Sequence, residues 1–87
     1  MEKLEVQKYI IRKLMNFNPP KWGGSHTEER NLFKGLPAHL IGTKTVRKAF
    51  DELVKSGMLL KAKKTGEWHY SLNPRMAKEI YGFVNLE

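Results

Sequence analysis

Cationic and hydroxyl side chains are concentrated between residues 43 and 64. This segment carries seven Lys and Arg against two acids, a net +5, whereas residues 1–42 carry +3 and residues 65–87 carry −1. Ammonium, guanidinium and hydroxyl groups donate hydrogen bonds to phosphate oxygens, and a guanidinium can also pair with a guanine edge. Such local concentration favours a surface for a polyanion over a generally basic exterior. The candidate contact residues are Thr43, Lys44, Thr45, Arg47, Lys48, Lys61, Lys63 and Lys64.

The first part of this segment has the pattern of an amphipathic helix. At about 100° per residue, one face carries only apolar residues and the opposite face is centred on lysines. The apolar face holds Val46, Ala49, Phe50, Leu53 and Val54, and the basic face holds Lys44, Lys48 and Lys55. Thr43 has the hydroxyl that a helix start needs, and Gly57 can end the helix in a left-handed conformation. We therefore expect a helix over 43–56, packed on one side and basic on the other.

A hairpin and a further helix follow. Residues 58–64 are strand-like, and Trp68, Tyr70 and Leu72 alternate with His69 and Ser71. The turn between these runs, residues 64–67, contains a glycine, which predicts a β-hairpin. The pair at 73–74, Asn then Pro, supplies a cap and a first helical residue, so we expect a last helix over about 74–84.

The N-terminal segment, residues 2–17, predicts a helix with two apolar strips. The first strip consists of Val6, Ile10, Leu14 and Phe17, and the second of Leu4, Ile11 and Met15. The Asn-Pro-Pro run at 18–20 ends the helix. A terminal helix over one small core needs only one strip. The second strip therefore packs against the C-terminal helix or forms, with that helix, a homodimer contact, and both readings stay open.

The segment between residues 25 and 42 is interrupted. Ser25 and Glu28 have the spacing of a capping box, which predicts that a helix begins there. Gly35 and Pro37 break the pattern that follows, so we expect one broken helix or two short helices over 27–41.

Residues 45–59, TVRKAFDELVKSGML, together with the strand that ends Tyr70-Ser71-Leu72, resemble the winged helix-turn-helix superfamily. The resemblance covers about residues 25–74, and the chain also looks like the small winged-helix proteins common in archaea. It implies an α+β, mostly helical fold with a two-stranded wing and added outer helices, in a single domain over 1–87. One segment departs from the family pattern: residues 36–42 read LPAHLIG where a regular Ala-x-x-Leu-Gly is usual.

The resemblance implies binding of duplex DNA and a role as a transcriptional regulator. The N-terminal half of helix 43–56 would enter the major groove, where Arg47 meets a base or instead pairs with Asp51. Lys44 and Lys48 would meet phosphates, and the wing lysines would lie near the backbone or form a solubilising edge. Two alternatives remain: a winged-helix protein-interaction module, and an RNA-binding protein. Trp22 and Trp68 either pack or stack on an unpaired base.

Other function classes find no support in the residues. The chain has no cysteine, which excludes disulfides and thiolate zinc sites, and His26, His39 and His69 lack short metal-ligand spacing. No phosphate-binding glycine loop and no set of nucleophile, base and orienting group can be assembled. We expect a non-enzyme without metal, cofactor or small-molecule substrate. We also expect no membrane span and no secretory signal, and hence an intracellular, cytoplasmic protein.

Overall fold

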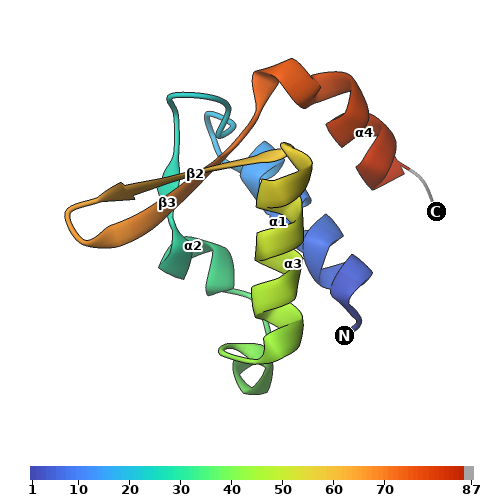
Figure 1. Ribbon diagram of the computed structural model, residues 1–87, viewed down its shortest axis with the longest axis vertical. Coiled ribbons are helices and arrows are strands. Elements are labelled where there is room, and N and C mark those ends of the chain that lie inside the picture. Colours follow the sequence, from blue (N-terminus) through green and yellow to red (C-terminus); the bar gives the residue numbers. More distant parts are fainter. Residues whose placement is uncertain (86–87) are drawn as a thin grey trace.

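Four α-helices and a three-stranded antiparallel sheet make up residues 1–85, the part of the chain that the computed structural model describes (Figure 1). The helices are α1 (Lys3–Asn16), α2 (Glu29–Phe33), α3 (Lys44–Ser56) and α4 (Ala77–Asn85). The strands are β1 (Thr27–Glu28), β2 (Leu59–Lys64) and β3 (Glu67–Leu72), in the order β1-β3-β2. Single 3-10 turns at Ala38–Leu40 and Pro74–Met76 precede α3 and α4. The α+β class and the expected first, third and last helices are confirmed.

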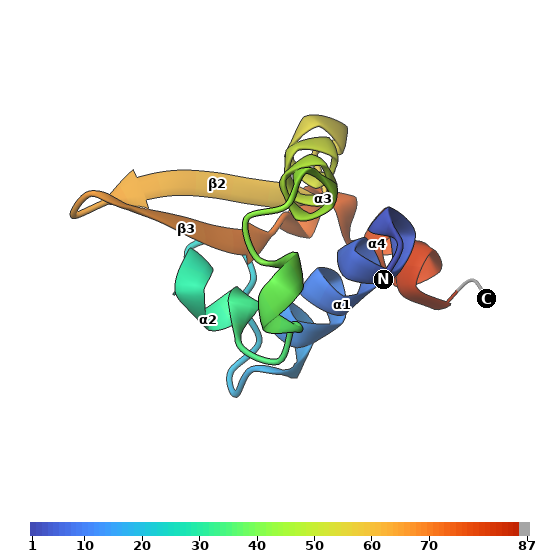
Figure 2. The ribbon, with the colours of Figure 1, turned by 90° about the horizontal axis from the view of Figure 1, so that it is seen from below.

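Strands β2 and β3 form the predicted hairpin, which projects from the helical body (Figures 1 and 2). Its two-residue turn places Thr65 at φ 50° and Gly66 at φ 79°. Positive φ at both central residues matches the right-handed twist of the strands they join. The turn fixes the register, which pairs Lys64 with Glu67 and Leu59 with Leu72.

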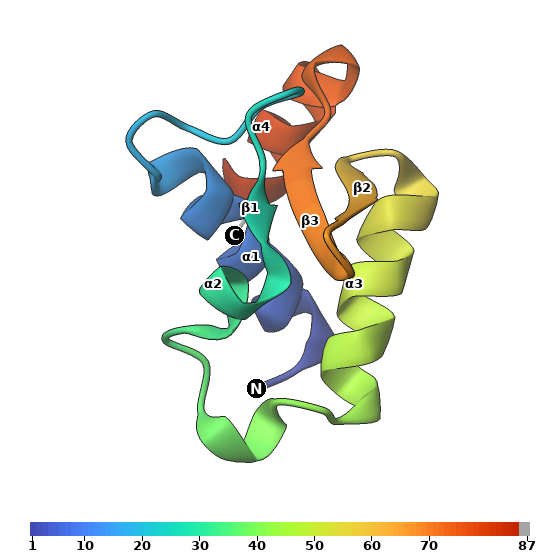
Figure 3. The same cartoon turned by 90° about the vertical axis from the view of Figure 1, so that its left-hand side faces the viewer.

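A third strand was not expected, and it changes the start of α2. Thr27 pairs with Tyr70 and Glu28 with His69, so β1 lies along the outer edge of β3 (Figure 3). The predicted capping box at residues 25–28 is therefore wrong, because α2 begins only after Glu28 and has no side-chain cap. Pairing with β3 satisfies backbone hydrogen bonds of β1 and buries Thr27. This pairing replaces the capping interaction that residues 25–28 would otherwise form. The sheet is three-stranded rather than a two-stranded wing alone.

The segment between β1 and α3 forms two short helices, one of the two expected outcomes. Five residues make up α2, and the 3-10 turn follows after Gly35 and Pro37. Gly35 has φ 94°, and a Cβ built there would lie 2.5 Å from the Tyr9 hydroxyl oxygen. The left-handed backbone conformation favours glycine at this bend, and any side chain there would also have to displace the Tyr9 hydroxyl.

Helix α1 crosses the core, and most of its second apolar strip is covered by other parts of the same chain. The buried core residues from the helices and sheet include Val6, Ile10, Ile11, Leu14, Val46, Phe50, Leu53, Leu59, Leu72, Ile80 and Val84. Both α3 and α4 pack on α1, and Arg12 donates from Nη2 to the Val84 carbonyl at 2.6 Å. Ile11 is fully buried within one chain, so it offers no surface to a second copy. Leu4 remains half exposed, and a homodimer through it stays a prediction.

Among residues 1–85, no helix has both the length and the apolar character needed to cross a bilayer.

Candidate nucleic-acid interface

The start of α3 is fixed by the Thr43 hydroxyl. Thr43 Oγ1 accepts a hydrogen bond from the Val46 amide at 3.4 Å and donates one to the Leu40 carbonyl at 2.7 Å. Gly42, at φ 89°, turns the chain into this cap. The predicted cap is confirmed. Because the hydroxyl already joins two backbone groups, its main role in the structure is to hold the helix start.

The basic side of α3 faces solvent. Lys44, Arg47 and Lys48 are exposed and Thr45 is half-buried, whereas the opposite side of the helix packs in the core. Neither α4 nor any other described segment covers these side chains. Among residues 1–85, the Arg47 side chain makes no ion pair with Asp51 and no hydrogen bond, so its guanidinium is available to an external acceptor.

One acid on α3 is neutralised by α1. Lys3 Nζ lies 2.7 Å from Glu52 Oε2, and this hydrogen bond is the main cause that lowers the pKa of the Glu52 carboxyl. Both side chains are about half exposed, so the contribution to stability is small. The pair nevertheless reduces the negative charge beside Lys48 on the outer side of α3.

The three wing lysines lie on two faces of the hairpin. Lys61 pairs with Tyr70 and Lys63 with Trp68, which places both lysines on the side of the sheet that faces α3. Lys64 alternates to the other face, beside His69 and His26. The structure thus brings Lys61 and Lys63 together with the α3 side of the molecule and separates Lys64 from them.

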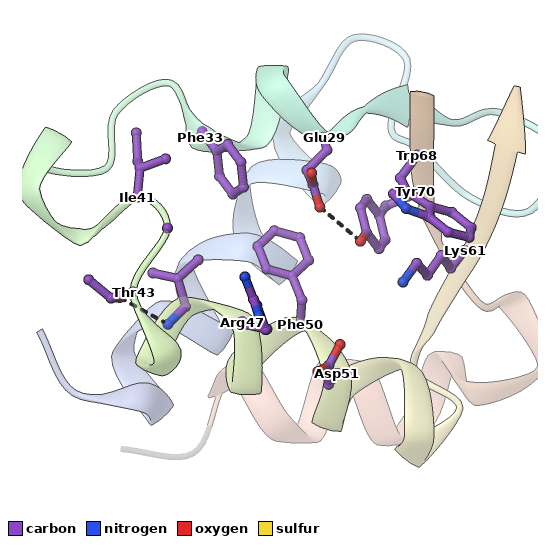
Figure 4. Close-up of a pocket in the computed structure, with 12 residues that line it drawn as sticks. Glu29, Phe33, Ile41, Thr43, Arg47, Phe50, Asp51, Lys61, Trp68 and Tyr70 are labelled. Carbon is purple, nitrogen blue, oxygen red and sulfur yellow. Dashed lines mark hydrogen bonds between the residues drawn. The ribbon is translucent and has the colours of Figure 1, made fainter. Parts of the chain in front are cut away.

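A hollow of about 440 Å³ lies between α3 and the wing (Figure 4). Its floor is formed by the buried side chains of Val46, Phe50 and Tyr70. Four charged residues line it from three elements: Glu29 of α2, Arg47 and Asp51 of α3, and Lys61 of β2. Its aromatic lining consists of Phe33, Phe50, Trp68 and Tyr70. The charges balance, so the hollow suits a ligand with both donor and acceptor groups.

Glu29 is oriented into the hollow by Tyr70. The Tyr70 hydroxyl donates to Glu29 Oε1 at 3.0 Å (Figure 4). Burial, and secondarily the Glu29 charge, raise the pKa of Tyr70, so the phenol keeps the proton that it donates. The Tyr70 ring in turn packs against Phe50, with ring centroids 4.9 Å apart.

Sequence reasoning missed most of this lining. Glu29, Phe33, Asp51 and Tyr70 were not candidates, although the two-residue turn at 65–66 would have allowed Lys61 to be placed opposite Tyr70. No sequence signal indicated that Glu29 and Phe33 of α2 would line the hollow, because a five-residue helix is too short to show a periodic pattern.

Two of the three histidines meet on the far face of the hairpin. His26 Nδ1 and His69 Nδ1 are 2.8 Å apart, and the rings pack edge to face with centroids at 4.7 Å. Desolvation, with smaller effects of Lys64, His69 and Lys21, lowers the pKa of His26. Within the described residues, no group of three or more histidines and acids lies close enough to hold a metal ion. The pairing depends on the unexpected strand β1, so spacing alone could not reveal it.

The two tryptophans have different surroundings. Trp22 packs beside Tyr81, with ring centroids 5.9 Å apart, and its backbone bridges to Leu72, which agrees with a packing role. Trp68 is 39% exposed, and Lys61 Nζ and Lys63 Nζ lie 4.1 Å and 5.5 Å from its ring centroid. Trp68 therefore presents an aromatic surface flanked by two cations at the rim of the hollow.

Comparisons of the chain with protein-family models, with curated proteins and with solved structures found no match.

Proposed function

We propose that this chain binds duplex DNA through the outer side of α3 and the α3-facing side of the wing. The observation that carries this proposal is the free basic surface of α3: Lys44, Arg47 and Lys48 are exposed on a helix whose other side is anchored in the core. A basic helix that is anchored on one side and exposed on the other has the dimensions and the donors that a major groove accepts.

The proposed fold assignment is winged helix-turn-helix. In its favour are the order of elements, with a short helix, α3 and then a hairpin, and the resemblance carried by residues 45–59. In such docking, Arg47 reads a base edge, since a planar guanidinium pairs with guanine O6 and N7, while Lys44 and Lys48 contact phosphates. Lys61 and Lys63 follow the backbone from the wing. We further propose a role as a transcriptional regulator, for which base reading by Arg47 would supply the sequence preference.

A second candidate is a protein-interaction module. Two large apolar side chains, Ile41 and Trp68, are 41% and 39% exposed and both border the hollow beside α3. Exposed apolar anchors surrounded by polar groups are typical of protein interfaces. An acidic partner would meet the same lysines that duplex DNA would meet.

Titration of labelled nucleic acid against salt separates these candidates. The protein is added to a fluorescent 20-base-pair DNA duplex, an RNA duplex of the same sequence and a poly-glutamate of similar length, and anisotropy gives the affinity. Contacts with about four to six phosphates predict that DNA affinity falls by roughly 10²–10³ between 50 and 200 mM salt. Binding of poly-glutamate at least as tight as that of DNA would favour the protein module, and preference for RNA would favour the RNA-binding alternative.

A further inference from the structure

We propose that the hollow between α3 and the wing binds one unpaired nucleotide whose base carries an exocyclic amino group. This inference rests on the proposed function and extends it, because it assigns a site for a single base within the same DNA-contacting surface. Four features of the hollow support it.

The first feature is size and place. A volume of about 440 Å³ falls within the range of about 300–1,000 Å³ of small-molecule sites. Arg47 and Lys61, two of the predicted DNA contacts, stand on its rim. A strand that is held by these cations therefore passes the opening, and one unpaired nucleotide of that strand can turn into it.

The second feature is the exposed ring at the rim. Trp68 is 39% exposed, and the end of the hollow away from it is lined by the apolar side chains of Phe33 and Ile41 (Figure 4). Stacking on an aromatic ring is the common means by which proteins hold unpaired bases. Lys61 Nζ now lies over this ring, 4.1 Å from the centroid. Because the Lys61 side chain is exposed and flexible, a base can replace the ammonium, which then reaches the phosphate of the same nucleotide.

The third feature is a pair of carboxylates. Glu29 accepts from the Tyr70 hydroxyl through one oxygen and keeps further acceptor capacity. Asp51 makes no ion pair with another described residue, and it lines the opposite wall on α3. Carboxylates accept hydrogen bonds from amino groups such as those of cytosine and adenine. Thymine has no amino group, so it should fit less well.

The fourth feature is charge balance. Glu29 and Asp51 alone would repel a phosphate, but Arg47 and Lys61 offset them; both cations are exposed, whereas Glu29 is half-buried. A nucleotide matches this arrangement, with its amino-bearing base inside and its phosphate at the rim.

Paired and bulged duplexes test the proposal. Three labelled DNA duplexes with the same paired sequence are compared. The first has no bulge, the second has one extra, unpaired adenine, and the third has one extra, unpaired thymine. The full chain with Trp22→Phe serves as the protein, because Trp68 is then its only tryptophan and reports stacking through quenching. We expect about tenfold tighter binding of the adenine bulge than of the paired duplex, a smaller gain for thymine, and quenching only with a bulge. Trp68→Ala should remove the preference and leave binding of the paired duplex.

Two further arms distinguish the source of the nucleotide and the class of ligand. Adenosine monophosphate alone should quench Trp68 fluorescence at high concentration. If adenosine monophosphate quenches Trp68 but the protein binds none of the DNA duplexes, the hollow is a site for free nucleotides and the proposed function is overturned. Equal, salt-dependent affinity for paired and bulged duplexes would overturn the nucleotide site and leave the proposed function standing. L-phenylalanine serves as a non-nucleotide aromatic ligand. Quenching of Trp68 by L-phenylalanine but not by adenosine monophosphate would overturn the nucleotide site and favour a site for an aromatic amino acid.

Discussion

Lys61 and Trp68 are diagonal neighbours on the hairpin, and the Lys61 ammonium lies 4.1 Å from the centre of the Trp68 ring. The two-residue turn sets this arrangement, because it fixes the register that puts both side chains on the α3-facing side. The ring restricts a long, flexible cation and holds it beside the hollow. Lys64, four residues from Trp68 on the same hairpin, points to the other face.

Charge removal on the wing should therefore depend on the face. We expect Lys61→Ala to lower the slope of log affinity against log salt by about 0.9, the contribution of one phosphate contact. Lys64→Ala, the matched control from the other face, should change the slope by much less. The check is anisotropy titration with a paired duplex at four salt concentrations. Equal effects of the two substitutions would contradict the assigned faces.

Removal of the α3 cap should destabilise the fold. In Thr43→Ala the Val46 amide and the Leu40 carbonyl both lose their side-chain partner, so the free energy of unfolding should fall by about 1 kcal/mol. For a domain of this size the melting temperature should drop by about 4–8 °C. Thr45→Ala removes a hydroxyl with no hydrogen bond to another described residue, and it should not lower the melting temperature, because alanine has the higher helix propensity. Comparable losses in both variants would count against the cap.

Stability should decline at alkaline pH through Tyr70. Its pKa is raised in the folded chain by burial and by Glu29, so folding favours the protonated phenol. This contribution is fully present below the unfolded pKa of about 10 and is lost as pH rises beyond it. We expect denaturant unfolding between pH 9 and 11 to show a smaller loss of stability for Tyr70→Phe than for the wild type. Identical slopes for the two proteins would refute this role of the phenol.

A second pH dependence should appear on the acid side. Desolvation and the nearby Lys64, His69 and Lys21 lower the pKa of His26, and Glu28 opposes them. The folded chain thus disfavours the protonated imidazole of His26. The stability that the neutral imidazole contributes is fully present above the unfolded pKa of about 6.5 and is lost as pH falls through the folded pKa.

Histidine variants and NMR test this acid dependence. His26→Gln should flatten the loss of stability between pH 7 and 5, whereas His39→Gln, at an exposed position on the 3-10 turn, should not. NMR titration should give His26 a midpoint below 6.5. A midpoint at or above that value would contradict the lowered pKa.

The parts of the fold that sequence predicted are those with local signals. Helix 43–56 was correctly bounded because Thr43 and Gly57 mark its ends and five apolar residues recur at helical spacing along one face. The hairpin was predictable from its turn residues. Strand β1 was not, because a two-residue strand has no pattern of its own and forms only where β3 offers an edge. A non-local pairing thus replaced the local capping box between Ser25 and Glu28.

The candidate site was predictable only in part, for the same physical reason. The exposure of Lys44 and Lys48 follows from the helical period, and the structure agrees with it. The hollow, by contrast, needs α2, α3 and the hairpin to come together in space. Glu29 and Asp51 are ordinary surface acids when read along the chain. Their placement on opposite walls of the hollow depends on tertiary packing, and no local pattern in the sequence indicates it.

If the outer side of α3 holds phosphates, removing two of its lysines must weaken the binding of duplex DNA. Lys44→Gln with Lys48→Gln is compared with Lys34→Gln and Lys78→Gln, which removes the same charge from exposed lysines outside α3 and the wing. Circular dichroism checks that both variants remain folded, and anisotropy with a paired duplex gives the salt slope. We expect the α3 variant to lose about two units of slope and the control almost none. Unchanged affinity and slope in a folded α3 variant would contradict DNA binding through this helix.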